Sequence, residues 1–242
     1  MKIVLWILLV ILILIGLYIL FLGICALLVD PKKDYEHFSP FYFRVLNSAT
    51  ACSFVLARLR ISSSGMEKVP WDQRFLLVGN HMSNFDPIIT WYVFRRNNVA
   101  FISKVQNFKI FIFGRLIHRC GFMAIDRENA GAAYQTITRA ADMLKQGEAS
   151  IGIYPEGTRN RTPEKGLLPF HNGVFKIAQM AKVPIVVVAI KGTENIHRNY
   201  PLRGTKIQVD VVDVIPAEEI AGKRTREIGE KVAAALNADL QR

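Results

Sequence analysis

The chain has 242 residues, a formal net charge of +11 and an apolar share of 51%. This length suits one domain with a small appendage, and the apolar share is enough for a large core together with a membrane segment. Because the balance is strongly basic, we expect anionic partners: nucleic acid, or an anionic membrane face and phosphorylated substrates. The 3 cysteines are scattered without a Cys-x-x-Cys pair, which excludes a disulfide framework and a cysteine-based zinc site.

Residues 3–29 contain no charged side chain. A helix needs roughly 20 apolar residues to cross a bilayer core, so this run is long enough to span a membrane and too long for a cleaved signal peptide. Only Lys2 precedes the run, whereas Lys32, Lys33 and further arginines follow it. The positive-inside rule therefore predicts a single-pass anchor at residues 1–30 of a cell-membrane protein, with the remaining chain on the cytoplasmic face. A membrane span also disfavours nucleic acid as the partner, and no nucleic-acid-binding motif is recognised.

Residues 31–64 are predicted to form a polar, proline-marked linker and an amphipathic helix. From residue 41 to residue 60, apolar side chains recur at helical spacing. The members of this stripe are Phe41, Val45, Ala49, Cys52, Leu56 and Leu59. Two interpretations are open: a helix packed on the domain, and an interfacial helix lying among lipid headgroups beside the anchor. Three serines and Gly65 then break the pattern, and the globular domain is expected over residues 65–242.

Within the globular part, short apolar runs alternate with helical ones. Strands are predicted at residues 75–78, 99–103, 122–125, 151–154, 185–190 and 206–214. Helices are predicted at residues 87–96, 108–120, 130–146, 174–181 and 217–240, with Gly147 ending the third helix. This alternation predicts an α/β fold: a central, largely parallel mixed sheet flanked by helices.

The most informative segment is residues 75–87, where an apolar strand leads through a polar loop to a helix. Ligands of α/β sheets bind beyond the carboxyl ends of strands, so His81 lies where an active site is expected. In one continuous helix His81 and Asp86 would point about 140° apart, so only a loop lets them meet. Asp86 precedes Pro87 and suits a helix N-cap. These residues alone fit a loop histidine with a capping aspartate, or a general base oriented by a carboxylate.

A second polar segment follows the strand that ends near Tyr154. Gly157 permits close backbone approach to a ligand, and the planar fork of Arg159 suits phosphate. Thr158 adds a hydroxyl donor. Glu156 would repel a phosphate, so it is expected to position an arginine or to accept a hydrogen bond from a substrate hydroxyl. Seen alone, the segment is also typical of a polar surface turn.

Two further strand ends carry cations. Arg127 ends the predicted strand at 122–125, and Lys104 follows the one at 99–103. Both are expected at the same edge of the sheet as Arg159, where they would meet the same phosphate. The alternative for each is a solvated charge or a surface ion pair, which is the usual state of an isolated basic side chain.

Taken together, these residues resemble the 1-acylglycerol-3-phosphate acyltransferases, within the glycerolipid acyltransferase superfamily. Four segments appear in the family's order: the HxxxxD motif at His81 to Asp86, Gly121 to Arg127, the Glu-Gly-Thr-Arg segment at Glu156 to Arg159, and the apolar strand at residues 183–188. The resemblance covers about residues 69–215. Val187 and Asn160 depart from the family pattern, which leaves acyl-chain and donor preference open.

The resemblance implies that His81 and Asp86 are the catalytic pair. It implies that Arg127, Glu156, Gly157 and Arg159 hold the glycerol phosphate, and Thr158 and Lys104 are the further substrate-binding residues predicted here. The implied reaction is acyl transfer from acyl-CoA or acyl carrier protein to lysophosphatidic acid, giving phosphatidic acid for phospholipid biosynthesis.

No cofactor or metal is expected, since the sequence contains no His-Glu-x-x-His and no clustered Cys/His set. Glycerol-3-phosphate and other lysophospholipids remain alternative acceptors. A non-catalytic membrane lipid-binding protein is a more distant alternative. A lipid hydrolase would need a nucleophile such as the Gly-x-Ser-x-Gly elbow, which is absent.

Overall fold

The structure is a computed structural model that describes residues 2–33, 35, 37–126 and 128–241. The strands are β1 (Leu59–Ser64), β2 (Leu76–Gly79), β3 (Ala100–Lys104), β4 (Met123–Ile125), β5 (Ile151–Ile153), β6 (Ile185–Lys191) and β7 (Thr205–Ile215). All except β1 coincide with a predicted strand to within about one residue at either end, inside the usual scatter of strand boundaries.

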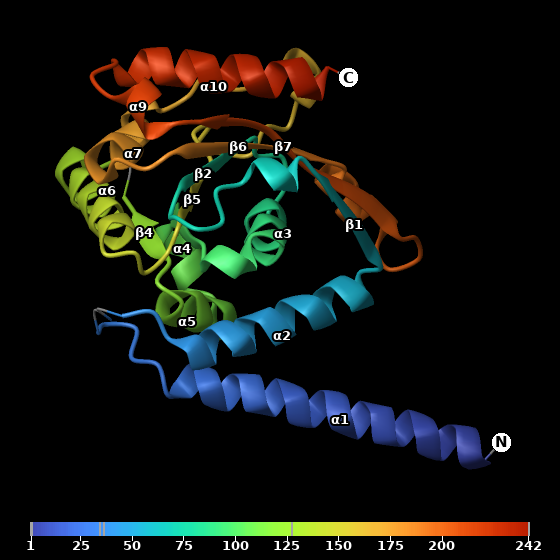
Figure 1. The fold of residues 1–242 in the computed structure, drawn as a ribbon. Helices are drawn as coiled ribbons and strands as arrows, with labels where there is room; N and C mark the ends of the chain where they lie inside the picture. Colours follow the sequence, from blue (N-terminus) through green and yellow to red (C-terminus); the bar gives the residue numbers. More distant parts are fainter. Residues whose placement is uncertain (1, 34, 36, 127, 242) are drawn as a thin grey trace.

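Over the described residues, the strands form one sheet in the order β1-β7-β6-β2-β5-β3-β4. Neighbouring strands are parallel except β6 and β7, which are antiparallel. The central strands β2, β5 and β6 are apolar and almost wholly buried, as parallel strands covered on both faces should be. The predicted α/β fold with a central, largely parallel mixed sheet flanked by helices is confirmed (Figure 1).

The helices are α1 (Lys2–Leu27), α2 (Pro40–Leu56), α3 (Asp86–Val93), α4 (Val105–Phe108), α5 (Phe111–Arg119), α6 (Ala130–Lys145), α7 (Lys176–Ala181), α8 (Ile196–Asn199), α9 (Ala217–Ile220) and α10 (Thr225–Leu240). Gly147, with φ of +70°, follows α6 as predicted. The helix predicted at 217–240 is divided into α9 and α10 around Gly222, whose φ is +72°. In Figure 1, α10 lies across one face of the sheet, while α2, α3 and α5 lie on the other.

β1 is the strand that the sequence pattern does not predict. The helix expected over residues 41–60 ends at Leu56, and Arg58 turns the chain with a left-handed φ of 51°. Residues 59–64 then pair in parallel with β7 at the edge of the sheet. Serines carry little intrinsic strand preference, so this strand forms because β7 supplies the hydrogen-bonding partner. The sheet therefore includes residues on the linker side of the predicted boundary at residue 65.

α1 is a single apolar helix of 26 residues, and it is the one helix among the described residues with the length and composition to cross a membrane. Its side chains are mostly exposed, and it contacts the domain only near its carboxyl end. There the Tyr18 hydroxyl lies 2.7 Å from that of Ser48, and the Tyr42 hydroxyl donates to the Cys25 carbonyl at 3.0 Å. The length of α1, about 39 Å at the normal helical rise, suffices for a bilayer core.

α2 packs on the domain through a different face from the predicted stripe. Phe41, Cys52 and Leu56 are exposed. The side chains buried against the domain are instead Tyr42, Val45, Leu46, Thr50 and Phe54. The sequence has apolar residues on two sides of this helix, and the structure shows which side meets the core. The packed-helix interpretation is confirmed for that side, while an interfacial position of the outward side stays a prediction.

Gly152 on β5 leaves room for the aromatic ring of Phe101 on β3. An added Cβ would lie 2.4 Å from the Cε1 atom of Phe101. We therefore expect Gly152→Ala to lower the free energy of unfolding by about 1–3 kcal/mol, measured by thermal or chemical unfolding in detergent. An added Cβ at Gly173 meets nothing within 4 Å, so Gly173→Ala should change stability by less than about 0.5 kcal/mol. Equal stability losses in the two variants would contradict this packing argument.

Candidate active site

Asn80 fixes the carboxyl end of β2 to its neighbour β6. Its Nδ2 donates to the Ile190 carbonyl at 2.9 Å, and its Oδ1 accepts from the Ile190 N–H at 2.8 Å. Asn80 is buried, so both bonds are shielded from competing water. His81 comes directly after this amide clamp. Its main chain is therefore held in a defined place relative to the sheet.

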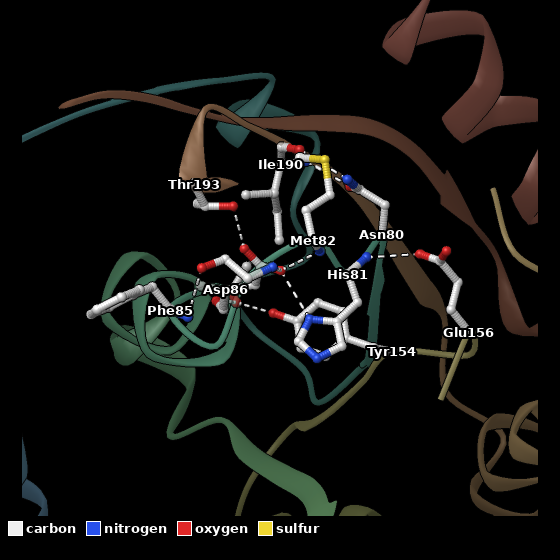
Figure 2. A network of polar contacts seen from close by, with 11 residues as sticks. Asn80, His81, Met82, Phe85, Asp86, Tyr154, Glu156, Ile190 and Thr193 are labelled. Carbon is white, nitrogen blue, oxygen red and sulfur yellow. Dashed lines mark hydrogen bonds and ion pairs between the residues drawn. The ribbon is translucent and has the colours of Figure 1, made fainter. Parts of the chain in front are cut away.

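His81 and Asp86 meet in the loop after β2, as predicted from their spacing. The Nδ1 of His81 lies 2.9 Å from Oδ2 of Asp86 (Figure 2). The same oxygen accepts the main-chain N–H of Met82 at 2.6 Å and of Ser83 at 2.7 Å. Asp86 is wholly buried, whereas the His81 side chain keeps 16% of its exposure. When a neutral imidazole donates from Nδ1, its lone pair is on Nε2, which is the arrangement of a general base.

Asp86 is not the N-cap of α3. It is the first residue of that helix, Phe85 occupies the cap position, and the cap makes no side-chain hydrogen bond. The Asp86 carboxylate turns back toward His81, Met82 and Ser83, because these donors surround it in the preceding loop. Pro87 does lie in the first turn, as predicted. The prediction that Asp86 is the N-cap is thus wrong, and its carboxylate contacts the His81 ring instead.

The Tyr154 ring stacks on the His81 ring. The two ring centroids are 4.6 Å apart, with 20° between the planes. The Tyr154 hydroxyl lies 2.5 Å from that of Thr90, which itself donates to the main-chain carbonyl of Asp86. Burial, and then the nearby charge of Asp86, raise the pKa of Tyr154 well above its usual value of 10.0. Tyr154 therefore stays protonated and ties β5 to α3.

Glu156 holds two segments of main chain together. It is 3% exposed. Its Oε1 accepts the His81 N–H at 2.8 Å, and its Oε2 accepts the Leu168 N–H at 2.9 Å. Burial raises the pKa of this carboxyl above its usual value of 4.5, although the two N–H donors oppose the shift. Both oxygens are engaged by the chain itself, a role that the sequence does not predict.

A cavity of about 440 Å³ opens beside His81. The polar part of its wall includes His81, Lys104, Gly157 and Arg159, together with the uncharged side chains of Thr50, Asn84, Ser103 and Asn107. Most of the remaining wall is apolar and includes Leu46, Ile88, Trp91, Ile102, Phe113, Ile117 and Phe122. A cavity of this size with a few convergent polar groups is typical of a small-molecule site.

The structure thus gathers most of the predicted site residues. Arg159 is half-buried and forms no ion pair with any residue that the structure describes. Gly157, with φ of +70°, lets the chain turn toward the cavity, as expected for a close-approach glycine. Thr158 is exposed and does not line this cavity. Arg127 lies outside the described residues.

Comparisons with known proteins agree with this geometry. The sequence model of the Acyltransferase family matches residues 60–191. The chain belongs to the acyltransferase family. Among the described residues, no group of three or more His, Cys, Asp or Glu side chains is arranged to hold a metal ion.

Curated relatives of this acyltransferase carry one name. The 1-acyl-sn-glycerol-3-phosphate acyltransferase of Haemophilus influenzae is 33% identical over 166 residues, which are 66% of this chain and 68% of the relative. The Escherichia coli protein of the same name is 31% identical over 153 residues, which are 63% of this chain and 61% of that relative. The match thus spans about six-tenths of the E. coli protein's length.

A solved structure shares the fold of this acyltransferase. The crystal structure of the 1-acyl-sn-glycerophosphate (LPA) acyltransferase PlsC from Thermotoga maritima superposes with a TM-score of 0.67 and 20% identity. The superposition covers 82% of this chain and 78% of the Thermotoga chain. At this identity, the likeness supports the fold alone.

A substitution can test whether Glu156 holds the main chain or contacts the substrate. Glu156→Ala leaves the buried N–H groups of His81 and Leu168 without acceptors, at a cost of about 1–3 kcal/mol each. We expect reduced stability and a reduced kcat, with little change in the KM of the acceptor. Glu164, exposed in the same loop, gives the matched control Glu164→Ala. A raised KM with unchanged stability would show instead that Glu156 contacts the substrate.

The raised pKa of Glu156 predicts a pH dependence of stability. The folded state binds this proton more tightly than the unfolded state, so the contribution is present below the usual value of 4.5 and is lost as pH rises through the raised pKa. Glu156→Gln cannot titrate. The unfolding free energy of the native chain minus that of Glu156→Gln should therefore decrease as pH rises above the usual value of 4.5. A difference that stays constant across this range would contradict the shift.

Proposed function

We propose that this acyltransferase transfers a fatty acyl group from an acyl thioester to the free hydroxyl of lysophosphatidic acid, giving phosphatidic acid. The observation that carries the proposal is the His81–Asp86 pair at the wall of an apolar cavity that also holds Arg159. A base beside an acyl-sized apolar space and an unpaired cation fits an acceptor that has both a phosphate and a fatty chain. The shared name of the relatives supports the same acceptor.

The acceptor's phosphate docks against Arg159 and Lys104. The guanidinium of Arg159 offers two parallel N–H donors that match phosphate oxygens, and Lys104 adds a point charge at the rim. This docking holds the acceptor's free hydroxyl near Nε2 of His81. Positioning of this kind supplies part of the catalytic effect, because the hydroxyl is oriented before the reaction starts.

Nε2 of His81 removes the hydroxyl proton while the oxygen attacks the carbonyl carbon of the thioester. Asp86 stabilises the imidazolium that forms, because its carboxylate stays ionised and its Oδ2 accepts the hydrogen bond from Nδ1–H at 2.9 Å. The tetrahedral intermediate then collapses and the carbon–sulfur bond breaks. The leaving sulfur takes the proton from Nε2, and His81 returns to its neutral form.

We place the reaction at the cytoplasmic face of a membrane. The apolar helix α1 supports an anchor at residues 1–30, and the basic residues that follow it support this orientation. Residues 31–58 would link the anchor to the acyltransferase domain, whose sheet begins with β1 at Leu59, with the outward side of α2 in the headgroup region. Exposed apolar side chains on α2, among them Phe41, Val55 and Leu56, support that placement.

His81→Ala should abolish acyl transfer from a labelled thioester to lysophosphatidic acid, with a loss of about 10²–10⁴-fold, because the general base is removed. The purified variant in detergent should unfold at nearly the same temperature as the native chain. Assays with acyl-CoA and with acyl carrier protein in parallel would identify the donor. Retained transfer by a folded His81→Ala protein would overturn the mechanism.

Arg159→Ala should impair use of phosphorylated acceptors in particular, because the phosphate loses its bidentate partner. We expect a rise in the KM of lysophosphatidic acid, together with a fall in kcat when the hydroxyl is less well placed. Arg161 is exposed in the same loop, so Arg161→Ala is the matched control. If a monoacylglycerol without the phosphate loses activity to the same degree, Arg159 does not bind the phosphate.

A further inference from the structure

Thr193 contacts the second oxygen of the Asp86 carboxylate. Its Oγ1 donates to Oδ1 of Asp86 at 2.5 Å, whereas His81 and the main chain use Oδ2 (Figure 2). Thr193 and Asp86 are both wholly buried. Thr193 follows β6 and lies outside the four segments on which the family resemblance rests. Sequence reasoning does not find it, since a lone threonine after a strand has no pattern.

The main chain on the N-terminal side of Thr193 is fixed at two points. Asn80 clamps the main chain of Ile190 three residues earlier. Gly192 then turns the chain with φ of +91°, and a Cβ there would lie 2.3 Å from the Lys206 carbonyl oxygen. The clamp and the turn together aim the Thr193 hydroxyl at Asp86. The contact is therefore built into the end of β6 and does not depend on a mobile loop.

We infer that Thr193 is a positioning residue for the catalytic pair, acting on His81 through the carboxylate of Asp86. A buried carboxylate needs a donor for each oxygen, because water cannot replace a missing one. Thr193 is the side-chain donor that the structure assigns to Oδ1. It keeps the carboxylate plane in the orientation in which Oδ2 faces Nδ1 of His81.

Loss of the hydroxyl has a predictable consequence for the pair. The carboxylate loses one of the donors that fix its plane, so His81 is held less firmly and kcat falls. The Asp86 anion, left with one hydrogen bond fewer, also gains more from a charged imidazolium beside it, so His81 holds its proton to higher pH. Among the described residues, the other titratable or charged groups around the pair are Tyr154, Glu156, Arg159, Glu194 and Lys104, which lines the same cavity as His81. Substitution at residue 193 changes none of them.

The test compares Thr193→Val, which keeps the size without the hydroxyl, with Thr193→Ser, which keeps the hydroxyl. For Thr193→Val we expect kcat to fall about 10–100-fold, the range for a hydrogen bond to a charged group, with the KM of lysophosphatidic acid nearly unchanged. The acid limb of its pH profile should move to higher pH. Thr193→Ser should restore both. Thr205, another buried threonine, gives the control Thr205→Val, which should leave the acid limb in place.

The activity readout rests on the proposed function, so a second readout is needed that does not. NMR titration of the imidazole signals, with His81 assigned from a His81→Asn sample, follows the ring directly. Its midpoint should rise in Thr193→Val and stay in place in Thr193→Ser. If Thr193→Val fails to fold, Thr193→Cys, a weaker donor of similar size, takes its place.

The outcomes separate the two claims. A native chain that transfers no acyl group would overturn the proposed function, while the NMR comparison would still decide the role of Thr193. An active native chain whose folded Thr193→Val variant keeps kcat, acid limb and NMR midpoint would overturn the inference alone. If both variants lose the same stability, and neither the acid limb of the pH profile nor the NMR midpoint of His81 moves, Thr193 has only a structural role.

Discussion

The wholly buried carboxylate of Asp86 is the interaction on which the rest of this site depends. An ionised carboxylate inside a protein costs several kcal/mol unless hydrogen bonds replace its lost water. Here the replacements come from the loop after β2, namely His81, Met82 and Ser83, and from Thr193 after β6. The carboxylate is stable only if the ends of these two strands lie side by side, as their parallel pairing ensures. The sheet order is thus a requirement of the contact between His81 and Asp86.

Glu156 is a second buried carboxylate that also needs hydrogen-bond donors, and it contacts His81 through the main chain. Glu156, after β5, accepts the main-chain N–H of His81 and links it to Leu168. Asp86 orients the imidazole ring, and Glu156 holds the backbone that carries it. Strands β6, β2 and β5 are consecutive in the sheet, so Thr193 after β6 reaches Asp86 from one side of β2, and Glu156 after β5 reaches the His81 main chain from the other. The His81 side chain, which would be mobile in an unsupported loop, is therefore held in a single orientation.

The features that the sequence predicts correctly are those encoded in a short local pattern of residues. Apolar runs predict β2, β5 and β6, and the spacing from His81 to Asp86 before a proline predicts a loop in which they meet. β1 is not predictable in this way, because its hydrogen bonds come from β7, about 145 residues further along the chain. The role of Glu156 is equally hidden, since its partners are main-chain N–H groups that every residue carries. Thr193 is hidden for a third reason: its partner Asp86 follows the neighbouring strand β2, 107 residues earlier in the chain.

The inner face of α2 shows how the apolar helix α1 and the candidate active site are connected. Leu46 and Thr50 line the cavity beside His81, while Ser48 of the same helix contacts Tyr18 of α1. One helix therefore contacts the apolar helix α1 on one side and forms the cavity wall on another. A lipid acceptor keeps its chain in apolar surroundings while its phosphate stays near water, and this arrangement suits both needs. The amphipathic segment that looks like an appendage in the sequence thus forms part of the wall of the site.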